Sequence, residues 1–176
     1  MRGVFATCFG LGWPLAARLP LDPAARLLAT WLLSLVGVWL IAWSVYVFTL
    51  PSAALWTIPA LTAINLVVGR RSLVALSRDP TVRAVAVGQW LVSAWCVGWL
   101  ALIVSYSGGD WVGDWFGHWD RTIFFLARGP HDILFTGFDP LPSRPPLVNV
   151  ILGAWLRVTR FDFAHYQLVL TLFNSL

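Results

Sequence analysis

Residues 27–50 read LLATWLLSLVGVWLIAWSVYVFTL, an apolar run without a charged side chain. A transmembrane helix needs about 20 largely apolar residues, so this run is long enough to cross a bilayer. Pro51 follows directly and stops the helical pattern. The run therefore predicts a membrane-spanning helix and an all-α, polytopic integral membrane protein.

Two further apolar segments follow, at residues 53–69 and 84–106. The first is close to the lower length limit for a span, and the second exceeds it. Residues 1–106 are therefore expected to form an amino-terminal transmembrane region with three transmembrane helices. Residues 107–147 form the next unit, a polar loop.

Composition excludes an ordinary soluble domain. The chain has 176 residues, 59% of them hydrophobic and 11% charged, whereas soluble domains carry about 25% charged residues. The two cysteines, Cys8 and Cys96, are too few for a disulfide framework or a cysteine metal site. We expect no nucleic acid partner, because the arginines follow membrane topology and do not form one patch.

The arginines also predict orientation. Arg70, Arg71, Arg78 and Arg83 lie between the second and third spans against a single carboxylate, Asp79. Short arginine-rich loops remain on the cytoplasmic side, and the amino terminus carries arginines as well. Three crossings then place residues 107–147 outside. The expected localisation is the plasma (inner) membrane, multi-pass, with a cytoplasmic amino terminus and an extracytoplasmic loop.

The carboxyl-terminal part, residues 148–176, is predicted as a short interfacial helix followed by the start of a fourth span. Residues 148–158 are apolar but too few to cross, and residues 161–176 also fall short. We therefore expect an amino-terminal fragment of a larger polytopic protein. The remaining transmembrane helices of that parent would be its partners, together with membrane lipids.

The polar loop reads SGGDWVGDWFGHWDRTIFFLARGPHDILFTGFDPLPSRPPL and holds five of the eight aspartates. Trp111, Trp115 and Trp119 recur every four residues, which predicts an amphipathic helix over residues 114–128. Because indole rings favour the membrane–water boundary, this helix is expected to lie on the outer leaflet. Asp114 would open the helix, where a carboxylate also serves as a cap.

The loop resembles the first outer loop of the GT-C membrane glycosyltransferases, over residues 108–176. The resemblance rests on Asp114, His118, Leu126 with Gly129, and the later run Arg144-Pro145-Pro146-Leu147. It is greatest to the bacterial branch related to protein mannosyltransferases and lipid A aminoarabinose transferase. The chain differs in having His118 where those enzymes have Tyr, Trp115 after the acidic residue where they have Glu, and three preceding spans.

The resemblance implies transfer of a sugar from a polyprenyl-phosphate donor to an acceptor hydroxyl on the outer face. Asp114 would be the general base and Arg144 the contact to the donor phosphate, with His118 and Asp110 binding substrate. Asp110 is the alternative base. The lipid-linked sugar donor is then the main ligand, and we expect the isolated 176-residue chain to be inactive.

Alternatives exist for several of these residues. Arg121 and Arg128 could bind the phosphate, although both are expected to meet lipid headgroups. The three histidines have no diagnostic ligand spacing, so no metal site is expected, and no cofactor follows from the sequence. The alternative function is a non-catalytic small membrane protein whose Asp- and Trp-rich outer loop binds a partner or lipid.

Overall fold

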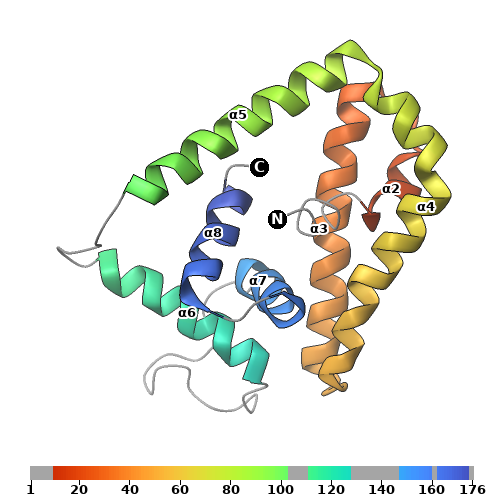
Figure 1. Ribbon diagram of the computed structural model, residues 1–176. Helices are drawn as coiled ribbons and strands as arrows, with labels where there is room; N and C mark the ends of the chain where they lie inside the picture. The colour runs from red at the N-terminus through yellow and green to blue at the C-terminus, as the bar shows by residue number, and fades with distance from the viewer. Residues whose placement is uncertain (1–9, 103–110, 128–146, 160–161, 175–176) are drawn as a thin grey trace.

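The computed structural model describes residues 10–102, 111–127, 147–159 and 162–174, and in these ranges all regular structure is helical. Figure 1 shows the arrangement of the elements. They are α2 (Trp13–Ala16), α3 (Pro23–Val47), the 3₁₀ helix η1 (Ser52–Trp56), α4 (Thr57–Ser77), α5 (Pro80–Leu102), α6 (Trp111–Ala127), α7 (Leu147–Val158) and α8 (Phe163–Asn174).

Three segments are long and apolar enough to span a membrane, as the sequence predicted: Pro23–Val47, Ser52–Ser77 and Pro80–Leu102. The first begins at Pro23 behind Asp22, whose side chain accepts a hydrogen bond of 2.9 Å from the amide of Ala25. A carboxylate cap followed by proline is a favoured helix start. The helix therefore begins four residues before the apolar run.

The expected loop between the second and third spans is instead almost entirely helical. Helix α4 continues to Ser77, and α5 begins at Pro80. The Asp79 carboxylate accepts hydrogen bonds from the amides of Thr81 (2.8 Å) and Val82 (3.2 Å) and so caps α5. Arginine is a good helix former, and this explains why the helix continues past the end of the apolar run.

The short helix α2 lies in a groove between α3 and α4. The amide of Gly12 donates to the Ser34 hydroxyl at 2.8 Å, in a buried position. The carbonyl of Gly10 accepts from the Asn65 side chain at 2.9 Å. Glycine permits this close approach, because a Cβ at Gly12 would overlap backbone atoms of α3.

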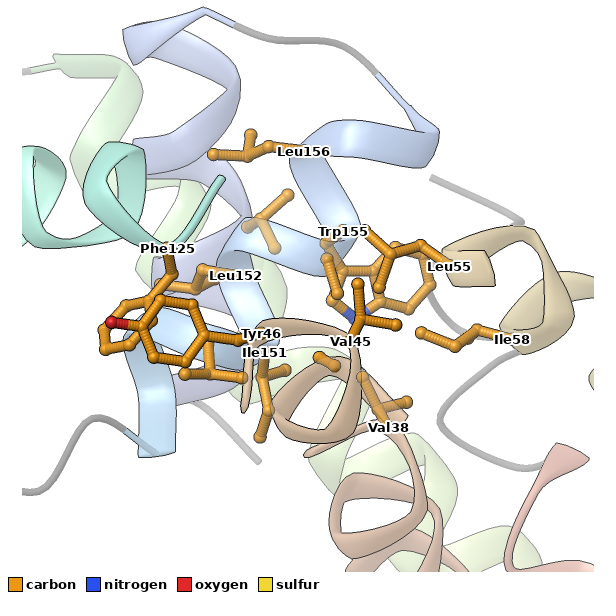
Figure 2. Packing of buried hydrophobic residues seen from close by; sticks show 14 of the residues in the cluster. Val38, Val45, Tyr46, Leu55, Ile58, Phe125, Ile151, Leu152, Trp155 and Leu156 are labelled. Carbon is orange, nitrogen blue, oxygen red and sulfur yellow. The ribbon is translucent and has the colours of Figure 1, made fainter. Parts of the chain in front are cut away.

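Helix α7 occupies the centre of the main hydrophobic core, where α3, η1, α6 and α8 surround it. Its residues from Asn149 to Leu156 are all buried. Figure 2 shows Trp155 of α7 beside Leu55 of η1, and Tyr46 of α3 beside Phe125 of α6. The chain therefore encloses a helix that the sequence predicted at the membrane interface.

Helix α5 contrasts with this core. It diverges from α3 along its length (Figure 1). Only 6% of the most apolar stretch of α5 is buried inside the structure, against 33% of the corresponding stretch of α3. Trp90, Trp95 and Trp99 are more than half exposed. Exposed apolar surface on this scale is rare in soluble monomers and suits contact with lipid.

Candidate functional site

The helix predicted over residues 114–128 is present as α6, which begins three residues earlier, at Trp111. Position 114 lies in the first turns of α6, one helical turn before His118. The His118 side chain is exposed. Asp110, Arg144 and the side chain of Asp114 lie outside the described residues.

The packed face of α6 is centred on Thr122 and Phe125, both buried. Phe125 meets the ring of Tyr46 at a centroid distance of 4.9 Å, near the carboxyl end of α3. Trp119 contacts Phe163 and Tyr166 of α8 at 5.6 and 5.2 Å. The helix is thus amphipathic, as predicted, and its most buried side chain, Thr122, lies beside the predicted tryptophan face.

A buried polar network joins α6 to α7. The Asn149 side-chain amide donates to the His118 carbonyl at 2.8 Å and to the Thr122 hydroxyl at 3.1 Å. The Thr122 hydroxyl in turn donates to the same carbonyl at 2.9 Å. Because Asn149 is 4% exposed and Thr122 fully buried, these bonds replace contacts with water. They fix the His118 backbone against the first turns of α7.

Tyr166 of α8 completes this region. Its side chain is fully buried, and its ring meets that of Trp119 of α6 at a centroid distance of 5.2 Å. Its role is to hold α8 against α6.

Sequence analysis missed Asn149, Thr122 and Tyr166. The one available signal was Asn149, a carboxamide within the apolar run of residues 147–156. Buried polar side chains need hydrogen-bond partners, so this residue predicts a partner on another helix. The sequence does not say which helix supplies it.

The Asn149→Leu variant is expected to lose about 1–3 kcal/mol of stability, because the hydrogen bonds of a buried amide disappear. Thermal melting of the detergent-purified chain measures this loss. The double variant with Thr122→Val is expected to lose less than the sum of the single losses, by at least about 0.5 kcal/mol. Additive losses would contradict the network.

Two cavities lie near this network. One, of about 30 Å³, lies between Tyr46, Phe125 and Arg157, which suffices for a water molecule but not for a sugar. The other is an apolar groove of about 260 Å³ between α3, α7 and α8. Its lining residues are Leu32, Leu35, Val36, Leu147, Val148, Ile151 and Phe173.

A further cation, Arg157, ends α7 close to the carboxyl end of α3. Its guanidinium donates to the Ser52 hydroxyl of η1 at 3.3 Å, and its side chain is exposed. Within the described ranges, no three His, Cys, Asp or Glu side chains gather in a way that could hold a metal ion.

Comparison with known proteins finds no matching family model, curated protein or solved structure. The site must therefore be interpreted from its own residues.

Proposed function

We propose that this chain contributes the first outer-face helix of a membrane glycosyltransferase. In this proposal a sugar moves from a polyprenyl-phosphate donor to an acceptor hydroxyl. Asp114 removes the acceptor proton as general base, and Arg144 binds the donor phosphate through its guanidinium. His118 and Asp110 bind substrate. The resemblance of residues 108–176 to the GT-C enzymes is the starting point.

The observation that carries the proposal is that the first turns of α7 contact α6 and also line the apolar groove. Asn149 binds the backbone of His118, one turn after position 114. Leu147 and Val148, next to Asn149 in the chain, line the apolar groove. The groove suits one part of an isoprenoid chain, and Arg144 precedes Leu147 by three residues. In this proposal the lipid part of the donor lies in the groove, beside the first turns of the helix that Asn149 joins to α6.

The ends of α3 support the proposed orientation. At its amino-terminal end, Leu27 and Trp31 pack against Val82, within the arginine-rich segment. Near its carboxyl end, Tyr46 packs against Phe125 of α6. A spanning helix places its two ends on opposite sides of a bilayer. If the arginine-rich segment lies on the cytoplasmic side, the carboxyl-terminal half of α6, which packs at the other end of α3, lies near the outer side. The proposal keeps the plasma (inner) membrane that the sequence led us to expect.

Donor-dependent sugar transfer tests the function. Membranes from cells that carry the gene in its native context are compared with membranes from a deletion strain, with a panel of radiolabelled polyprenyl-phosphate sugars. We expect one donor to support transfer that disappears in the deletion strain. Transfer equal in both strains with every donor would reject the glycosyltransferase proposal in favour of a non-catalytic protein.

Cysteine labelling tests the orientation. In a background with Cys8 and Cys96 replaced by alanine, Asp120→Cys and Arg78→Cys each introduce one exposed thiol. We expect a membrane-impermeant maleimide to label the first variant in intact spheroplasts and the second only after permeabilisation. The reverse pattern would invert the proposed topology.

A further inference from the structure

A second cavity lies at the arginine-rich end of the molecule, far from α6 in the fold. It has a volume of about 470 Å³ and opens between α2, the start of α3 and the end of α4. Its polar wall consists of Arg26, Ser72 and Asp79, and Trp13 and Leu76 belong to its apolar wall. This volume is in the range of small-ligand pockets.

Two opposite charges line this cavity without pairing. The Arg26 Nη2 atom donates to the Leu21 carbonyl at 2.8 Å, whereas its Nε is shielded from solvent and has no acceptor. Across the part of the chain that the structure describes, neither Arg26 nor Asp79 has an ion-pair partner. Shielded donors of a charged group are costly when unsatisfied. Arg26 and Asp79 thus bring opposite charges to one cavity, and both side chains are only partly buried.

One of the two oxygens of the Asp79 carboxylate accepts both of the hydrogen bonds at the start of α5. Both of its hydrogen bonds, from the amides of Thr81 and Val82, end on Oδ1. The Oδ2 atom makes neither of them, and Asp79 is one of the residues that line the cavity. The Ser72 hydroxyl adds a group that both donates and accepts.

We propose that this cavity binds the headgroup of a phosphoethanolamine lipid. The phosphate diester lies on the Arg26 guanidinium, which suits phosphate oxygens. The primary ammonium donates to Asp79 Oδ2 and to Ser72, while Trp13 and Leu76 cover the glycerol region. An anionic headgroup without an amine would meet the Asp79 charge uncompensated, and a quaternary ammonium has no N–H to donate.

The site is independent of sugar transfer, so lipid binding and the proposed reaction can fail separately. The experiment uses native mass spectrometry of the full chain in detergent. It is titrated with phosphatidylethanolamine, phosphatidylglycerol and phosphatidylcholine of identical acyl chains. We expect phosphatidylethanolamine to bind about tenfold more tightly than the other two, the equivalent of one charged hydrogen bond.

Three variants make the test specific. Asp79→Asn preserves the cap of α5, because asparagine caps as well as aspartate. It is expected to weaken phosphatidylethanolamine binding and to strengthen phosphatidylglycerol binding, because the repulsion from the Asp79 charge disappears, so that the preference for phosphatidylethanolamine is lost. Arg26→Gln is expected to weaken binding of all three lipids. Arg78→Gln, an exposed arginine outside the cavity wall, should change nothing. Phosphatidylglycerol binding as tightly as phosphatidylethanolamine, or Asp79→Asn without effect, would overturn the proposal.

Discussion

In native membranes, the Asp114→Asn variant is expected to lose donor-dependent sugar transfer by a factor of about 10²–10⁴, the usual contribution of a general base. Asparagine has nearly the shape of aspartate and a similar helix propensity, and position 114 lies within α6. The substitution therefore removes the proton acceptor and leaves α6 able to form. The initial rate of transfer is measured at equal protein level.

Asp120→Asn is the matched control. It removes the same charge from the same helix at an exposed position, six residues further along, and should leave the rate unchanged. A normal rate in Asp114→Asn together with a lost rate in Asp110→Asn would move the base to Asp110. Normal rates in both variants would exclude Asp110 and Asp114 as the base and contradict the proposed mechanism.

The Gly12→Ala variant is expected to lose about 2–3 kcal/mol of stability, the upper part of the range for overpacking. A Cβ at Gly12 would overlap the Thr30 carbonyl and lie 2.6 Å from the Ser34 amide nitrogen. Both are backbone atoms of α3, so no rotamer change relieves the clash. Helix α2 must then separate from α3, which also breaks the hydrogen bond from Gly12 to Ser34.

Gly88→Ala in α5 is the control, because no heavy atom lies within 4 Å of a Cβ at that position. It should be neutral or stabilising by up to about 1 kcal/mol, the helix-propensity difference. Ser34→Ala removes the hydrogen bond from Gly12 but leaves room for α2 to pack against α3, so a loss of about 1 kcal/mol of stability is expected. Thermal melting in detergent measures all three variants. Equal melting temperatures of Gly12→Ala and Gly88→Ala would contradict the close packing of α2 against α3.

The three long apolar helices were predictable because hydropathy is a local property of the chain. A run such as residues 27–50 needs no knowledge of the rest of the protein to predict a helix long enough to cross a bilayer. The period of the tryptophans likewise predicted α6, with an end one residue from the observed Ala127. The segment between α4 and α5 was assigned incorrectly as a loop, since arginines mark a membrane boundary but do not end a helix.

Helix pairing was not predictable, because it depends on contacts between residues far apart in sequence. Gly10 meets Asn65 across 55 residues, and Asn149 meets His118 across 31. Apolar side chains give no preference for one neighbour within lipid, where the surroundings are equally apolar. Close approach at small residues and buried polar bonds make that choice.

The sequence by itself thus determined three apolar helices, an amphipathic helix with its acidic residues, and the cluster of four arginines between the second and third apolar segments. The tertiary structure alone decided that α7 is enclosed in the core, that its first turns meet both α6 and the apolar groove, and that Arg26 and Asp79 line one cavity. The physical reason is the range of the forces. Hydropathy and helical period act within about 20 residues, whereas shape and hydrogen-bond complementarity exist only once helices are packed together.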